Sequence, residues 1–234
     1  STPKPSSAAS DVYKRQVHTM THPTPSAASS AAALSATSGR RARLKNATRD
    51  IHERLDKRIM DFQPFADRER YTAFLQTQYA LHRDVQALFV DPALNALLPQ
   101  LAERSRLALI EQDLHDLGAA PPSDQPAPSF TFAAQHHVPT ALGWLYTVEG
   151  SNIGAAFLLK AAGRLGLDGR LGARHLAPHP DGRAAHWRDF IAQLDDVQLS
   201  PEEESHVDAG ARAAFAAALT HVERHCTASR QADR

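Results

Sequence analysis

The chain contains very little cysteine. Cys226 is the single cysteine among 234 residues, which excludes a disulfide framework and any zinc site built from several cysteines of this chain. An excess of charge is also missing, because 26 basic and 26 acidic residues give a formal net charge of zero. The bulk charge therefore gives no reason to expect a nucleic acid or an anionic membrane as partner. These absences fit a reducing compartment, and we expect a cytoplasmic protein.

Long apolar runs and alternating patterns are absent as well. No apolar segment is long enough for a signal-peptide core or for a helix across a bilayer. No stretch alternates between apolar and polar residues as a half-buried strand does. Apolar residues instead recur every three or four positions, which predicts an all-α fold, and the length suits one domain with a substantial core. We expect this domain to be a monomer.

The two ends of the chain differ in composition from the rest. Residues 1–38 are rich in Ser, Ala, Thr and Pro and lack apolar periodicity, which predicts disorder. Alternatively, Met20 is the natural start and the residues before it are an artefact of cloning or read-through. We expect the folded domain to cover residues 39–226 and residues 227–234 to form a flexible tail.

Proline, glycine and capping residues punctuate the helical pattern. Between residues 118 and 136, four prolines predict a loop. Ser200-Pro201-Glu202-Glu203 is typical of a helix start, with a cap, a first-turn proline and acidic residues. The pattern as a whole predicts six helices, over about residues 40–63, 71–89, 97–117, 139–163, 187–194 and 200–222.

The helix predicted over residues 139–163 carries two glycines in its interior, Gly150 and Gly154. Each glycine costs about 1 kcal/mol relative to alanine at such a position. Because they are four residues apart, they lie on one face and leave bare backbone there, with Ser151 and Asn152 alongside. The pair indicates either close packing of a neighbouring helix or close approach of a planar ligand.

A planar ligand needs a second contact from elsewhere, and His52 is the candidate. It follows Ile51 of the apolar face of the first predicted helix, where a histidine is more often a packing residue. Combined with the glycine pair it fits haem, which takes an axial imidazole on one side and leaves the other side for oxygen. Lys45, two turns before His52, and Tyr146, one turn before Gly150, could contact the haem propionates or be ordinary surface residues.

At these residues the chain resembles a known family. The segment Leu44–Asp56 resembles the proximal helix of bacterial haem oxygenases, and Leu145–Leu158, with its Gly-Ser-Asn-Ile-Gly core, resembles their distal helix. The similarity is greatest to the iron-acquisition enzymes of Gram-negative pathogens and extends over about residues 40–225. It implies a multi-helical bundle with haem between the proximal and distal helices.

The resemblance also implies a role for each residue of the site. His52 would be the proximal ligand of the iron of haem b. Gly150 and Gly154 would let the distal helix bend over the ring. The remaining implied roles are a distal water network for Ser151 and Asn152, and propionate contacts for Lys45 and Tyr146.

The activity implied by the resemblance is the degradation of haem to biliverdin, carbon monoxide and free iron. Haem would be both substrate and cofactor, and O2 would be the oxidant. The electrons would come from a ferredoxin or an NAD(P)H-dependent reductase, because the chain shows no flavin or iron–sulfur motif. Unlike the mammalian enzymes, the chain has no aspartate within the glycine motif, so Asn152 and water would deliver protons.

Two other functions stay open at this point. A di-iron oxidase on a related helical fold would use Glu-x-x-His motifs on separate helices, and Glu203 with His206 forms one such pair without a second. A non-catalytic haem carrier would share His52 but commonly closes both axial positions. Residues 150–154 offer no His, Met or Tyr for that purpose.

A cluster of basic residues precedes His52. Arg40, Arg41, Arg43, Lys45 and Arg49 fall within ten residues. Such a run is usually a solvated helix face, but near a haem edge it would steer an acidic electron donor by electrostatic attraction. Both interpretations remain open on the sequence alone.

Overall fold

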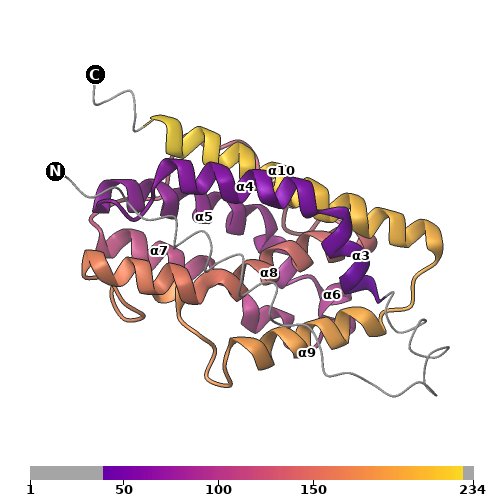
Figure 1. Cartoon of the computed structure of the whole chain (residues 1–234). Coiled ribbons are helices and arrows are strands. Elements are labelled where there is room, and N and C mark those ends of the chain that lie inside the picture. Colours follow the sequence, from indigo (N-terminus) through magenta and orange to yellow (C-terminus); the bar gives the residue numbers. More distant parts are fainter. Residues whose placement is uncertain (1–38, 229–234) are drawn as a thin grey trace, which may run out of the picture. The chain divides into compact units, whose positions relative to one another are not determined.

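The computed structural model describes residues 39–228 as a bundle of helices (Figure 1). The all-α prediction is confirmed for these residues, which contain no strand and only isolated bridges around Asp168. The segments predicted to be disordered or flexible, residues 1–38 and the end of the tail, lie outside the described residues. The elements are α3 (Arg40–Ala47), α4 (Arg49–Phe62), α5 (Arg68–Phe89), α6 (Pro92–Leu97), η2 (Leu101–Arg104), α7 (Leu107–Asp116), α8 (Val138–Ala162), η3 (Gly163–Leu165), η4 (Arg174–Leu176), α9 (Arg183–Asp196) and α10 (Pro201–Ala228).

Capping residues set the starts of the long helices. The Asp67 carboxylate accepts from the backbone N–H of Arg70 at the start of α5. At the start of α10, Ser200 and Glu203 form a reciprocal capping box, since each side chain accepts from the backbone N–H of the other. Pro139 lies in the first turn of α8, as predicted. The helices predicted over about residues 71–89, 139–163, 187–194 and 200–222 are confirmed as α5, α8, α9 and α10.

The first predicted helix is wrong as a single element. It is interrupted at Thr48, so Lys45 ends up in the last turn of α3 and His52 in α4. The Thr48 backbone turns away from helical geometry, with φ −110° and ψ 0°, and the Leu44 carbonyl accepts from both its N–H, at 3.0 Å, and its hydroxyl, at 2.8 Å. Placing Lys45 and His52 on one continuous helix face is therefore also wrong.

The third predicted helix is also divided. α6 ends at Leu97, and the chain then passes Pro99 and Gln100, whose φ of 64° is left-handed. Proline disfavours helical backbone at the residue before it, which explains why the leucine periodicity does not continue as one helix. The segment is instead built from α6, η2 and α7.

The longest helix of the described part, α10, runs along one side of the bundle from end to end (Figure 1). It packs against α8, α5 and α4. Where α10 meets α8, a Cβ atom on Gly143 would lie 2.1 Å from the Val207 carbonyl oxygen, and one on Gly210 would lie 2.2 Å from that of Thr140. These two glycines therefore allow backbone-to-backbone contact between the two helices. The adjoining core is apolar and includes Val148.

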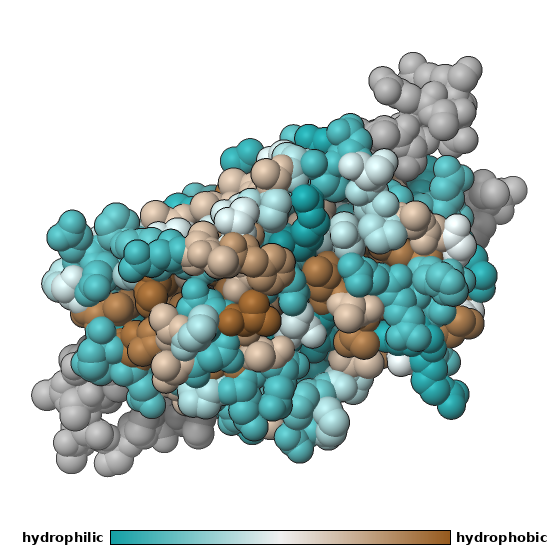
Figure 2. Space-filling view, turned by 180° about the vertical axis from the view of Figure 1, so that it is seen from behind, coloured by the Kyte–Doolittle hydropathy of each residue, from teal (hydrophilic) through white to brown (hydrophobic). Residues whose placement is uncertain are grey.

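On the side opposite to Figure 1, hydrophobic residues form several patches separated by hydrophilic ones (Figure 2). Within the described part of the chain, no helix is both long enough and apolar enough to cross a membrane.

Candidate haem site

His52 lies on α4 with its side chain 49% exposed, so it is not a core packing residue. Its Nε2 atom is 3.5 Å from Asp56 Oδ2, one turn further along α4, which is the outer limit for a hydrogen bond. The imidazole also lies against Phe215 of α10, with ring centroids 5.1 Å apart. The ring is thus supported by α10 while part of it remains open to a ligand.

Gly150 and Gly154 of α8 do not meet the backbone of another helix, unlike Gly143. In the described part of the chain, a Cβ atom on Gly154 would meet no atom within 4 Å. A Cβ atom on Gly150 would make only an ordinary contact of 3.5 Å with the ring of Trp187. The packing role that sequence alone left open for this pair belongs instead to Gly143 and Gly210. The bare backbone at Gly154 faces open space.

Ser151 and Asn152 bring polar atoms to the same turn. The Ser151 hydroxyl donates to the Val148 carbonyl at 2.7 Å, so its proton is used within α8 and its lone pairs remain available as acceptors. The Asn152 side chain has a buried Nδ2 atom without a partner among the described residues. An amide nitrogen without a partner inside a protein normally indicates a bound water.

Tyr146 lies one turn before Gly150 on α8 and is partly buried against Trp187, with ring centroids 5.8 Å apart. Burial raises the pKa of its phenol, Arg41 lowers it in part, and Asp195 raises it further. The side chains of Arg41 and Lys45 are both exposed on α3. The structure therefore adds a role for Arg41, which the sequence placed only in the basic cluster, as a cation acting on Tyr146.

A buried ion pair stands next to the glycine turn. Glu149 and Arg104 are almost fully buried and lie 2.9 Å apart, and Arg104 also donates to the His186 carbonyl. Burial raises the pKa of the Glu149 carboxyl, although Arg104 and Arg106 act against it. This pair fixes α8 to η2 and to the start of α9 just before Gly150.

Two buried histidines, His175 and His82, lie near Arg106, whose charge also acts on Glu149. His175 Nδ1 is 2.8 Å from Asp113, and burial lowers the pKa of His175 although Asp113 acts against it. His82 is close enough for the charges of His175 and Arg106 to lower its pKa further, after burial, to about 3. His175 Nε2 and His82 Nδ1 are buried without a partner among the described residues. Like Asn152 Nδ2, they indicate ordered water inside the protein.

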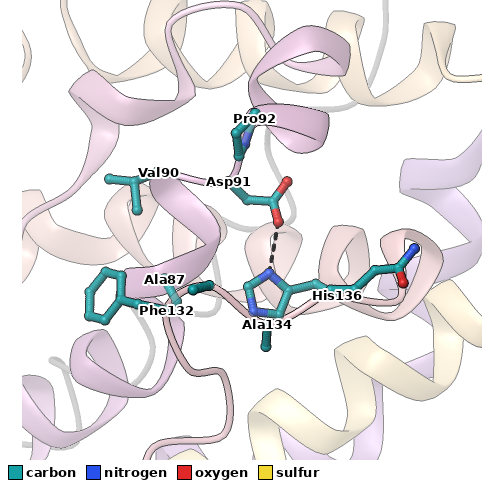
Figure 3. A pocket seen from close by; sticks show the side chains of 9 residues that line it. Ala87, Val90, Asp91, Pro92, Phe132, Ala134 and His136 are labelled. Atoms are coloured by element: carbon teal, nitrogen blue, oxygen red, sulfur yellow. Dashed lines mark hydrogen bonds and ion pairs between the residues drawn. The ribbon is translucent and has the colours of Figure 1, made fainter.

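A separate hollow of about 360 Å³ lies where α5 meets α6 (Figure 3). The His136 Nδ1 atom points to Asp91 Oδ2 at 2.8 Å, and Phe132 borders the hollow. None of the residues predicted for the haem site lines it. It is therefore not the site expected from the sequence.

The two helices that carry the predicted haem residues, α4 and α8, both pack on α10 and make few if any direct contacts with each other. One carries a histidine open on one side, and the other carries bare backbone over open space. A di-iron site finds no such support, because within residues 39–228 no three His, Cys, Asp or Glu side chains converge as metal ligands. Glu203, counted for that alternative, is part of the cap of α10.

Comparison with known proteins decides the family. The heme oxygenase family model matches residues 40–224. This chain belongs to the haem oxygenase family. A curated relative, heme oxygenase PigA of Pseudomonas aeruginosa, is 41% identical over 174 residues, which cover 74% of this chain and 86% of that protein. The predicted family and the predicted class of enzyme are therefore confirmed.

Solved structures agree with this membership. The NO- and CO-bound haem oxygenase of Neisseria meningitidis is 40% identical and superposes with a TM-score of 0.76, over 81% of this chain and 93% of that one. Haem oxygenase-1 of Synechocystis sp. PCC6803, solved in complex with haem, has a TM-score of 0.61 at 16% identity, over 82% and 96% of the two chains. At that identity the likeness concerns the fold alone.

Proposed function

We propose that this haem oxygenase binds haem b between α4 and α8, with His52 as the axial ligand, and converts it to biliverdin, carbon monoxide and free iron. The observation that carries the proposal is the pairing of a half-exposed histidine on α4 with open backbone at Gly154 on α8. A histidine ligand suits the reaction, since a thiolate would promote O–O cleavage instead.

Haem and O2 supply the oxidative chemistry, and the chain controls the space around the ring. Gly150 and Gly154 would let the α8 backbone lie close over the distal face, because neither fills that space with a side chain. A backbone at that distance restricts a small distal ligand to directions that point toward the ring edge. The neighbouring Glu149–Arg104 pair would keep this part of α8 in place.

The propionates would be held near Tyr146 of α8, where the charge of Arg41 of α3 acts. Tyr146 offers a phenol O–H there, and Lys45 offers an ammonium group on an exposed side chain. Arg41, whose charge already acts on Tyr146, is a third candidate for these contacts. Together they would fix the rotation of the ring and thereby the carbon that is oxidised.

Protons would reach the distal side through water rather than through a carboxylic acid in the glycine motif. Asn152 Nδ2 offers donors, and Ser151 Oγ offers acceptors.

The buried cluster of Asp113 and His175 offers a further place for water. Although burial raises the pKa of Asp113, hydrogen bonds from His175 and Arg174 outweigh this effect and lower the pKa, so Asp113 is ionised at neutral pH. His175 then donates from Nδ1 to Asp113 and leaves Nε2 as an unpaired acceptor, which suits a buried water.

Electrons would come from a small external donor such as a ferredoxin or an NAD(P)H-dependent reductase. The first test needs no native donor. Haem-loaded protein given ascorbate in air, with catalase present to remove peroxide, should lose the haem spectrum, turn green, and release iron to a ferrous chelator and carbon monoxide to reduced myoglobin. A haem spectrum that stays unchanged under these conditions would contradict the proposal and favour the haem carrier.

A further inference from the structure

Arg183, the first residue of α9, contacts the turn of α8 that contains Gly150 and Gly154. Its Nη1 donates to the backbone carbonyl of Asn152 at 3.3 Å, and its Nη2 donates to the backbone carbonyl of Leu176. A Cβ atom added at Gly150 or at Gly154 would meet no atom of Arg183 within 4 Å. The guanidinium therefore binds the backbone of this turn and leaves the bare face of both glycines uncovered.

Charge pairing does not explain why this guanidinium is partly buried. Among residues 39–228, no carboxylate lies within ion-pair distance of Arg183. The nearby Arg106 adds positive charge, and the buried carboxylate Glu149 is already paired with Arg104. A buried cation without a carboxylate is unfavourable, so the two bonds to backbone carbonyls are the interactions that hold this side chain.

The segment that carries the Leu176 carbonyl, to which Arg183 donates, is itself held by hydrogen bonds. Asp113 accepts from the backbone N–H groups of Arg174 and His175, at 2.9 and 3.0 Å. Arg106 donates to the His175 carbonyl. Leu176 follows directly in the chain, so the carbonyl that Arg183 holds there cannot shift independently of this network. Arg183 thus connects a firmly held loop to a helix turn that contains two glycines.

The turn of α8 around Gly154 lacks packing contacts on its open face, so contacts on its other sides must hold it in place. Glycine leaves the helix backbone with the greatest freedom, and nothing packs over Gly154 among the described residues. One turn along α9, Trp187 meets the Gly150 position from the side. We propose that Arg183 is a positioning residue, which clamps the Asn152 turn and so fixes how closely α8 covers the distal face of the haem. This inference rests on the proposed function.

Arg183→Gln and Arg183→Lys test the clamp, with Arg188→Gln as the matched control. Lysine keeps the positive charge but cannot bridge two carbonyls as the guanidinium fork does. Arg188 is an exposed residue of the same helix, so its replacement removes one charge from α9 without touching the turn. Melting temperatures of the haem-free proteins check that all variants fold.

The first measurement needs no haem. Amide hydrogen exchange over residues 150–158 should be faster by about threefold or more in both Arg183 variants, because the turn opens more readily without the clamp. The control should exchange like the wild type. Wild-type exchange in Arg183→Gln, or wild-type exchange restored by lysine, would overturn the inference.

The second measurement compares the binding of small and bulky alkyl isocyanides to ferrous haem, which probes the space on the distal side. The wild-type protein should prefer methyl isocyanide to tert-butyl isocyanide, and this preference should fall on the order of tenfold in both Arg183 variants, which corresponds to about 1.4 kcal/mol of lost restraint. A preference equal to that of Arg188→Gln would overturn the inference. If the wild-type protein takes up no haem, the proposed function fails instead, and hydrogen exchange alone decides the role of Arg183.

Discussion

At the scale of residues, burial separates the histidines into two kinds. His52 is half-exposed and available as a ligand, whereas His82 and His175 are buried and held in the neutral form. His52 could be singled out from the sequence because a local motif surrounds it. The pair His175–Asp113 could not, since its members are 62 residues apart and only the fold brings them together.

The buried His82 predicts a loss of stability in mild acid. Burial lowers its pKa from the ordinary value of 6.5 to about 3 in the folded protein, so between these values the unfolded chain binds a proton that the native protein does not. The free energy of unfolding should therefore decrease as pH falls below about 6.5. The free energy of unfolding can be measured by urea denaturation at pH 5 and pH 6. Its change with pH should be smaller in His82→Gln than in the wild type, by about 1 kcal/mol per pH unit.

The exposed His115 provides the control for this experiment. His115→Gln should keep the wild-type pH dependence, because it removes a surface imidazole and leaves the buried His82 unchanged. Equal slopes for His82→Gln and the wild type would show that His82 takes up its proton in the native protein and that its burial does not control acid stability.

At the scale of elements, α8 contains glycines with opposite functions. Gly143 lets α10 come into backbone contact, whereas Gly154 leaves open space. Sequence alone drew attention to the pair 150/154 by its spacing, but it could not show which glycine meets another helix, because that depends on where Val207 lies. Capping residues and proline predicted the starts of α8 and α10 correctly. The break at Thr48 was missed because threonine fits either a helix or its interruption.

Substitutions at the two kinds of glycine should have opposite effects. Gly143→Ala should lower the free energy of unfolding by about 1–3 kcal/mol or more, since the added Cβ atom would overlap the Val207 carbonyl. Gly154→Leu should leave it unchanged or raise it by up to about 1 kcal/mol, because leucine is the better helix former. Chemical denaturation of the haem-free proteins measures both.

Haem chemistry should then show the reverse order. Gly154→Leu should bind haem weakly and oxidise it poorly, because the isobutyl group occupies the space over the ring. Gly143→Ala, at a temperature where it is folded, should retain oxidation. Full oxidation by Gly154→Leu would mean that the open space beside this glycine is not where the ring lies.

At the scale of the whole molecule, the basic cluster before His52 is smaller than the sequence suggested. Arg40 is buried and paired with Glu204, and Arg43 pairs with Glu204 and Asp208. These two arginines anchor α3 to α10, so they are not part of a free docking surface. Arg41, Lys45 and Arg49 remain exposed, and they are the cations of the cluster that could attract an acidic electron donor.

Turnover with a protein donor should therefore depend on Arg41 and Lys45. Replacing both with glutamate should slow reduction by a ferredoxin-type donor and make it insensitive to salt, because steering by exposed charges is screened once the Debye length is about 10 Å or less. Because both residues are also propionate candidates, any loss of turnover with ascorbate measures that role, and the loss with the protein donor should be larger. Lys160→Glu with Arg164→Glu, at the far end of α8, serves as control. Equal salt dependence for both donors would show that this surface does not guide the donor.

At the scale of the whole molecule, the central claim is that haem lies between α4, which carries His52, and α8, which carries Gly154; both helices pack on α10. The most direct test is His52→Gly, which removes the imidazole and leaves room for a free one. The variant should bind haem weakly with an altered Soret band and little oxidation, and added imidazole should restore the wild-type spectrum. An unaltered Soret band and an unaltered rate of haem oxidation in His52→Gly without imidazole would contradict the account.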